Sequence, residues 1–270
     1  MSDTAAAQTQ MEHAPGTFSW IELATTDGPG AKKFYTDLFG WEPTDNPMGP
    51  DMVYTIYKIN GKDVAASYQK GAEMEQVPTH WACYVAVESA DETAAKAKSL
   101  GGTVVQEPFD VMDHGRMAAI TDPTGATFCI WQPKQHKGVG IKNENNSLCW
   151  NELMKKDSES AKDFYTKLFG WKSKTDADKG MPYTEWTNGE EHIGGMMQIQ
   201  PDMGPMPPNW GVYFAVDDCD AMVQKATSLG ARTYMPPTDI PNVGRFAVLA
   251  DPQGAAFNII KLDMQHHQNK

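Results

Sequence analysis

The stretch FYTDLFGW at 34–41 returns as FYTKLFGW at 164–171, and seven of the eight residues agree. Other segments repeat at nearly the same offset. Asp122-Pro-Thr-Gly, for example, is matched 129 residues later by Asp251-Pro-Gln-Gly. A period this long exceeds the roughly 20–50 residues of solenoid repeats and is the size of a complete domain. The sequence therefore predicts two similar domains in tandem.

The repeated octet has the pattern of an amphipathic helix. Phe34 and Leu38 form an i, i+4 apolar stripe, the run 27–30 (Asp-Gly-Pro-Gly) precedes it, and Gly40 is placed to end it. The alternating run 18–25 before the helix predicts a strand. Asn60-Gly61, between two short strand candidates, is a strong hairpin signal.

The pattern then starts again within the same copy. A strand is expected over 80–87, an alanine-rich helix over 91–100, and three strands after it. Each copy of about 130 residues is therefore two β-α-β-β-β units. One helix cannot cover both faces of a four-stranded unit, so paired units are expected to enclose a cup.

These elements predict an α+β protein with two tandem domains. Domain 1 is expected over 17–132 and domain 2 over 147–262, separated by a polar linker at 133–146. The segments 1–16 and 263–270 are expected to be flexible tails.

Composition narrows the class of protein. The net charge of −12 disfavours binding to nucleic acids and to anionic membranes, and no apolar run is long enough to span a bilayer. The start of the chain lacks the pattern of a signal peptide, so a cytoplasmic location is expected. Four dispersed cysteines without a CxxC pair indicate buried thiols, not a zinc site.

The strand, the octet helix and the Asp-Pro-x-Gly turn together resemble the vicinal oxygen chelate superfamily, the glyoxalase, bleomycin-resistance and extradiol-dioxygenase group. The resemblance covers about 17–132 and 147–262. The tandem arrangement and the Trp-x-Glu-Leu opening at Trp20 and Trp150 are similar to mycobacterial CFP30B/CFP32-like glyoxalase-domain proteins. The resemblance implies that the two modules of each domain form a half-open barrel around a ligand cavity.

The same resemblance implies a divalent metal held by His and Glu, but the matching positions hold other residues. They are Trp20, 66–68, Ala82 and Cys129 in the first copy, and Trp150, 195–197, Gly211 and Asn258 in the second. We therefore expect no metal cofactor, and a displaced divalent metal is the alternative.

Glu22 shares a strand face with Trp20, and His80 shares one with Ala82. Glu22 and His80 are therefore candidates for an acid–base pair. The alternative is that Glu22 and Glu152 are structural, bonded to backbone or arginine at the floor of the barrel.

Large apolar side chains and two arginines complete the candidate site. The predicted ligand-binding residues are Trp20, Trp150, Glu152, Cys129, Asn258, Trp186, Arg116 and Arg245. Tryptophans and methionines favour an apolar, adaptable pocket. Both arginines follow a glycine in equivalent positions and either grip an acidic ligand or form salt bridges.

These features predict a metal-independent protein, monomer or homodimer, that binds a small apolar or aromatic molecule. The alternative is a lyase, isomerase or hydroxylase-like enzyme acting on a small carbonyl compound, through Glu22 and His80 or a displaced metal.

Overall fold

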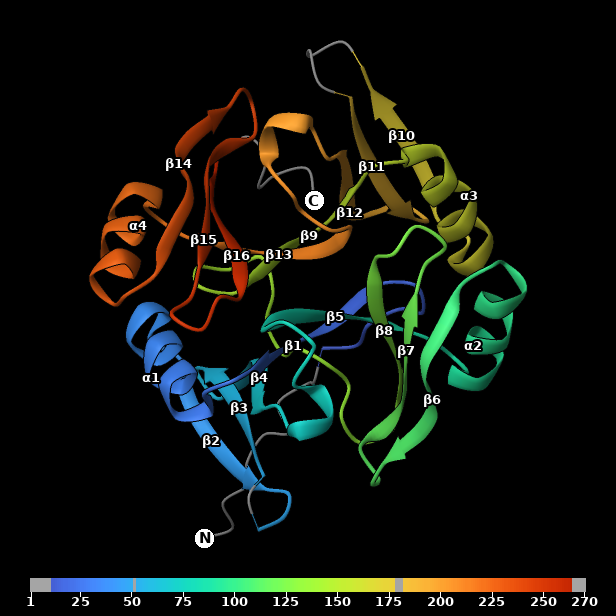
Figure 1. Ribbon diagram of the computed structural model, residues 1–270, viewed down its shortest axis with the longest axis horizontal. Coiled ribbons are helices and arrows are strands. Elements are labelled where there is room, and N and C mark those ends of the chain that lie inside the picture. The colour runs from blue at the N-terminus through green and yellow to red at the C-terminus, as the bar shows by residue number, and fades with distance from the viewer. Residues whose placement is uncertain (1–10, 51, 178–181, 264–270) are drawn as a thin grey trace, which may run out of the picture.

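A computed structural model describes residues 11–50, 52–177 and 182–263, which fold into two eight-stranded sheets flanked by four α-helices (Figure 1). The elements of the first domain are β1 (Phe18–Thr25), α1 (Gly28–Phe39), β2 (Glu42–Pro47), β3 (Val53–Ile59), β4 (Lys62–Gln69), η1 (Ala72–Met74), β5 (His80–Ala86), α2 (Ala90–Ser99), β6 (Thr103–Val111), β7 (Gly115–Thr121) and β8 (Thr127–Pro133). The elements of the second domain are β9 (Leu148–Lys155), α3 (Ser158–Phe169), β10 (Lys172–Asp176), β11 (Tyr183–Asn188), β12 (Glu191–Gln198), η2 (Pro201–Met203), β13 (Asn209–Ala215), α4 (Cys219–Ser228), β14 (Arg232–Ile240), β15 (Gly244–Ala250) and β16 (Ala256–Leu262).

Each sheet is built from two β-α-β-β-β modules, as predicted. The strand orders are β2-β3-β4-β1-β5-β8-β7-β6 and β10-β11-β12-β9-β13-β16-β15-β14. The first strand of a module pairs in parallel with its last strand, and the two modules meet where β1 runs antiparallel to β5 and β9 to β13. The sheets curve without closing, so the α+β architecture of two half-open domains is confirmed.

The repeated octet forms the second half of α1 and of α3. In α1 the carboxylate of Asp27 accepts a hydrogen bond from the Gly30 amide at 2.9 Å, which caps the N-terminus. Gly40 ends the helix with φ 72°, a left-handed conformation that glycine adopts without steric cost. Phe34 and Leu38 are buried on one face. The predicted helix and its end are confirmed.

The sequence analysis did not predict two strands, β2 and its counterpart β10 in the second domain. They lie at the edges of their sheets, and nearly all of their side chains are exposed. Without a buried face they show no apolar alternation, and β2 contains two prolines, which are tolerated at sheet edges. Only the pairing with β3 and β11 reveals them.

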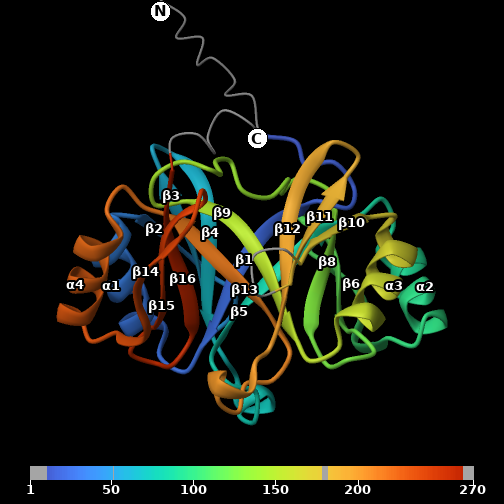
Figure 2. The ribbon, with the colours of Figure 1, turned by 90° about the horizontal axis from the view of Figure 1, so that it is seen from above.

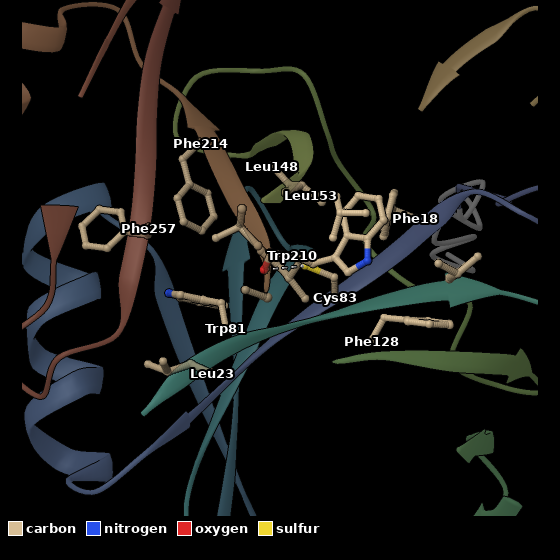
Figure 3. Packing of buried hydrophobic residues seen from close by; sticks show 14 of the residues in the cluster. Phe18, Leu23, Trp81, Cys83, Phe128, Leu148, Leu153, Trp210, Phe214 and Phe257 are labelled. Atoms are coloured by element: carbon tan, nitrogen blue, oxygen red, sulfur yellow. Dashed lines mark hydrogen bonds between the residues drawn. The ribbon is translucent and has the colours of Figure 1, made fainter. Parts of the chain in front are cut away.

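The convex faces of the two sheets pack against each other and form one hydrophobic core (Figure 3). The ring centroids of Phe18 and Trp210 lie 5.0 Å apart, and those of Trp81 and Phe214 lie 5.6 Å apart. Near the centre the thiol of Cys83 contacts the Trp210 carbonyl at 3.9 Å. Because aromatic residues of both domains interdigitate, the domains share one core and do not stand as separate units.

Polar groups of the octet cross the same interface in both directions. The Tyr35 hydroxyl donates to Asp251 and the Tyr165 hydroxyl donates to Asp122, each at 3.0 Å. In the second contact the ammonium of Lys155 adds an ion pair with Asp122 at 3.2 Å, and both side chains are fully buried. These contacts hold α1 beside α4 and α2 beside α3, on opposite sides of the molecule (Figure 2).

The segments that flank the sheets also pack. The indole N–H of Trp171 donates to the Gly16 carbonyl at 2.7 Å, and that of Trp41 donates to the Asn146 carbonyl at 2.8 Å. Val139 and Ile141, in the interdomain segment, are buried. Of the predicted tails, residues 1–10 and 264–270 lie outside the described residues. No helix in the described part of the chain is long and apolar enough to cross a bilayer.

Candidate functional site

The concave faces of the two sheets form two cups that open away from the shared core. One continuous depression of about 3460 Å³ takes in both cups. Alternation along β1 turns Trp20 and Glu22 into the first cup, and β9 does the same for Trp150 and Glu152 in the second. The fold thus presents the same pair of residue types at the floor of each cup.

The floor of the first cup is a hydrogen-bonded chain that ends at a carboxylate. The indole N–H of Trp20 donates to the Tyr54 hydroxyl at 3.2 Å, and that hydroxyl donates to Oε2 of Glu22 at 2.5 Å. From β5 the Tyr84 hydroxyl donates to the other oxygen, Oε1, at 3.0 Å. Four side chains from β1, β3 and β5 therefore form one polar cluster.

The second cup repeats this cluster atom for atom. Trp150 donates to the Tyr183 hydroxyl at 2.9 Å, and Tyr183 donates to Oε2 of Glu152 at 2.9 Å. The Tyr213 hydroxyl donates to Oε1 of Glu152 at 2.8 Å. We call each set a Trp–Tyr–Glu–Tyr cluster: Trp20, Tyr54, Glu22 and Tyr84 in the first cup, and Trp150, Tyr183, Glu152 and Tyr213 in the second.

Desolvation dominates the electrostatics of both clusters. It raises the pKa of Glu22 and of Glu152 above the usual range, and the tyrosine hydrogen bonds oppose this rise only in part. Desolvation, with the adjacent carboxylate second, also raises the pKa of Tyr54 and Tyr183 well above the usual range. The tyrosines therefore stay protonated and act as donors to the carboxylates.

The cups differ above the floor. In the first, His136 from the interdomain segment lies edge-on to Trp20 with ring centroids 4.4 Å apart, and its carbonyl accepts from the Trp131 indole at 2.9 Å. Burial lowers the pKa of His136 to about 4. In the second cup the position of Cys129 is taken by Asn258, whose amide donates to the Val212 carbonyl at 3.0 Å. Methionines line both cups, among them Met117 and Met197.

The two residues predicted as an acid–base pair, Glu22 and His80, both line the depression from neighbouring strands. His80 lines the depression at the start of β5, where it lies opposite Ala24 in the β1–β5 register, and the register partner of Glu22 is Ala82. The Nδ1 atom of His80 contacts the Pro78 carbonyl at 2.8 Å. In the described residues no hydrogen bond joins His80 to Glu22, whose carboxylate partners are tyrosines.

The prediction that Trp186 lines the cavity is wrong. Trp186 is fully buried in the convex core, with its ring 5.7 Å from that of Trp171 and 6.0 Å from that of Tyr165. On β11, Tyr183 and Glu185 face the cup. Trp186 follows Glu185 and therefore points to the opposite face of the sheet.

The two arginines predicted to bind a ligand lie outside the depression, where each forms a salt bridge. Arg116 forms a two-pronged ion pair with Asp91, at 2.7 and 2.8 Å, and Arg245 forms one with Asp220, at 2.6 and 2.9 Å. Neither arginine lines the depression, because alternation on β7 turns the adjacent Met117 into the cup and Arg116 outward. The salt-bridge interpretation is the correct one.

Sequence reasoning missed the tyrosines of both clusters. Tyr54 and Tyr183 are 129 residues apart, as are Tyr84 and Tyr213, so each pair matches at the offset of the repeat. The tyrosines could have been found by comparing the two copies. A search for polar residues that recur at the repeat offset, on strand positions facing the same way as Glu22, identifies both pairs.

The residues at the superfamily metal positions do not fit a divalent ion. The Trp20 indole offers a donor N–H and no lone pair, Ala82 offers no ligand atom, and burial raises the pKa of the Cys129 thiol far above neutrality. Each cluster contains one carboxylate, and both of its oxygens accept from tyrosines. Within the described ranges no group of three or more His, Cys, Asp or Glu side chains is arranged to hold a metal.

The family model for the glyoxalase/bleomycin resistance protein/dioxygenase superfamily matches residues 17–130 and 148–259. CFP32 of Mycobacterium tuberculosis is 44% identical over 254 residues, which span 93% of this chain and 96% of that protein. The anthracycline biosynthesis protein DnrV of Streptomyces peucetius is 34% identical over 261 residues, which span 92% of this chain and 94% of that protein.

Solved structures share the fold at low sequence identity. The Mn(II)-bound glyoxalase from Novosphingobium aromaticivorans superposes with a TM-score of 0.64 at 17% identity, over 95% of this chain and 86% of that one. The 2,2',3-trihydroxybiphenyl 1,2-dioxygenase from Sphingomonas wittichii gives 0.63 at 12% identity, over 93% and 94%. With both repeats matched by the family model, this chain belongs to the glyoxalase/bleomycin resistance protein/dioxygenase superfamily.

Proposed function

We propose that this chain binds small apolar or aromatic molecules in its two cups, without the metal centre of the superfamily. The observation that carries the proposal is the recurrence of the same Trp–Tyr–Glu–Tyr cluster at the floor of both cups. A concave apolar surface with a few convergent polar groups is the usual form of a small-molecule site.

The walls support an aromatic or apolar ligand. Trp131, Tyr68 and Met117 line the first cup, and Met197 and Phe246 line the second. Flat rings and flexible thioethers adapt to apolar ligands of varied shape. The name of DnrV links that relative to the biosynthesis of anthracyclines, which are polycyclic aromatic compounds.

Native mass spectrometry after incubation with a metabolite extract tests the proposal. We expect retained small molecules and a rise in melting temperature. The matched variants are Ala119→Trp and Val248→Trp, which fill the first and second cup, and Arg116→Trp, which adds the same ring on the outer face. Binding should be lost at the filled cup and kept in the control. Unchanged binding in the variant that combines Ala119→Trp and Val248→Trp would refute the proposal.

A second candidate is an enzyme that moves a proton on a small carbonyl compound. The observation that favours it is that both cup carboxyls face the depression with a raised pKa, which makes each a stronger base than an ordinary carboxylate. In deuterium oxide, exchange at the carbon next to the carbonyl of simple ketones, followed by NMR, should require Glu22 or Glu152. Equal exchange by the E22Q/E152Q variant would exclude this chemistry.

We also propose that the chain acts as a monomer. The apolar convex faces of the two sheets already cover each other within one chain. Light scattering at several protein concentrations should give the mass of one chain, and a constant doubled mass would contradict this.

A further inference from the structure

The hydrogen-bond inventory of the cup floors limits the ligands that they accept. In the first cup the Trp20 indole N–H is used on Tyr54, and the hydroxyl protons of Tyr54 and Tyr84 are used on Glu22. Every donor of the cluster is therefore consumed inside the cluster. A carboxylate has about four lone-pair sites, and these contacts occupy two of them. Within the cluster itself, acceptor capacity is left for a ligand and no donor is left.

The cluster of the second cup uses its donors in the same way. The indole of Trp150 donates to Tyr183, and the hydroxyls of Tyr183 and Tyr213 donate to the two oxygens of Glu152. Neighbouring residues differ between the cups, yet the direction of each hydrogen bond is the same. The remaining capacity is again on the carboxylate oxygens.

The charged side chains that line the depression are mostly acidic. Among the described residues that line it, six are Asp or Glu and one is Lys, and none is Arg. The carboxylates are Glu22, Asp63, Glu73, Glu152, Asp176 and Glu185, and the lysine is Lys174 on the edge strand β10. The arginines that an anionic ligand needs are held on the outer surface by Asp91 and Asp220.

We propose that each cup selects neutral or cationic aromatic ligands that carry a hydroxyl or amino donor, which binds the carboxylate of the Trp–Tyr–Glu–Tyr cluster, and rejects anionic ligands of the same shape. The proposal rests on the proposed function, because it assigns a ligand class to the same cups. An anion placed against the cluster carboxylate meets a like charge and finds no donor in the cluster, and such juxtapositions are strongly unfavourable across a binding contact.

Three naphthalene compounds of one shape provide the test: 2-naphthalenemethanol, 2-naphthylmethylamine and 2-naphthoate, compared at about pH 8, where free naphthoate is an anion and the free amine is mostly a cation. Tryptophan fluorescence and calorimetry measure each affinity. We expect the alcohol and the amine to bind, and the naphthoate to bind at least about tenfold more weakly. Naphthoate that binds as tightly as the amine would overturn the ligand class and leave the binding function intact.

Variants then locate the preference. In the E22Q/E152Q double variant the amide adds a donor and removes the charge, so the ratio of amine to naphthoate affinity should fall toward one. The matched control is E107Q/E159Q, which removes two charges from exposed positions outside the depression. A preference that survives in E22Q/E152Q would refute the proposal, and a failure of all three compounds to bind the unmodified chain would refute the binding function itself.

Discussion

Replacing Lys155 by methionine breaks the buried ion pair that joins the domains and leaves its partner in place. The Nζ–Oδ2 distance to Asp122 is 3.2 Å, and both side chains are fully buried. Methionine keeps the length of the aliphatic stem, so packing changes little, but Asp122 becomes a buried charge without a counterion. The remaining contacts of Asp122 are the Tyr165 hydroxyl on Oδ2 and, on Oδ1, the backbone amides of Thr124 and Ala126 and the Thr124 hydroxyl.

The size of the loss follows from these contacts. Removing one partner of a buried pair typically costs about 3–5 kcal/mol, and the donors that remain on Asp122 favour the lower end, about 3 kcal/mol. For a chain of this size that corresponds to a drop of roughly 6–12 °C in melting temperature. The other half of the molecule supports the estimate. There Asp251 takes the place of Asp122 and accepts a hydrogen bond from Tyr35, while Thr25 takes the place of Lys155. A buried aspartate is thus held there by neutral donors without a lysine, which favours the lower end of the range for Lys155→Met.

Urea unfolding at neutral pH measures the loss as a lower midpoint with an unchanged slope. The control Lys32→Met removes an exposed pair with Asp45 and should cost less than about 1 kcal/mol. Adding Asp122→Asn to Lys155→Met removes the stranded charge and should recover much of the loss. If Lys155→Met costs no more than Lys32→Met, or if the double variant is no more stable than Lys155→Met, the interface is not held as described.

Four further perturbations address the cup and its surroundings. Because the pKa of Glu22 is raised, the stability that its carboxyl contributes is complete below the ordinary value of 4.5 and is lost as the pH rises through the raised pKa. Thermal melts should therefore show that the melting temperature of E22Q rises relative to that of the unmodified chain as the pH increases. A difference in melting temperature that does not change with pH would contradict this. Tyr84→Phe removes the donor to Oε1 of Glu22 and should cost about 1–3 kcal/mol in urea unfolding at neutral pH, and no loss would show that the bond is dispensable. Dialysis against a chelator should leave the melting temperature unchanged, and stoichiometric metal in the purified protein would refute the proposal that the cups work without a metal. Arg116→Gln should change stability little and ligand affinity not at all, and weaker binding would show that this side chain reaches the cup.

Sequence patterns predicted the elements with a buried face and a strong boundary signal. The octet helix begins at the Asp27 cap and ends at Gly40, and the hairpin turns at Asn60-Gly61, both with positive φ. These features are local, so a single chain suffices to recognise them. Strand β2 lacked such a signal, because an exposed edge strand acquires its conformation from its neighbour.

The site was harder to predict because strand faces depend on parity. A shift of one position moves a side chain from the cup to the core, and this error placed Trp186 in the cavity and Arg116 beside it. Glu22 and Trp20 were correctly predicted to share a strand face, because they lie two positions apart on one strand. The partners Tyr54 and Tyr84 come from two other strands, whose register with β1 the sequence pattern does not specify.

The reciprocal contacts of the octet give the chain the geometry of a symmetric dimer whose halves are joined by a peptide. Tyr35 donates to Asp251 and Tyr165 donates to Asp122 at the same distance of 3.0 Å, so each half completes the other. In a true homodimer any substitution appears twice. Here both halves belong to one chain, so each can change separately. Corresponding positions hold Cys129 and Asn258 in one case, and Thr25 and Lys155 in another. One gene can therefore evolve two unlike cups on a single shared core, and neither half can be lost without exposing the core of the other.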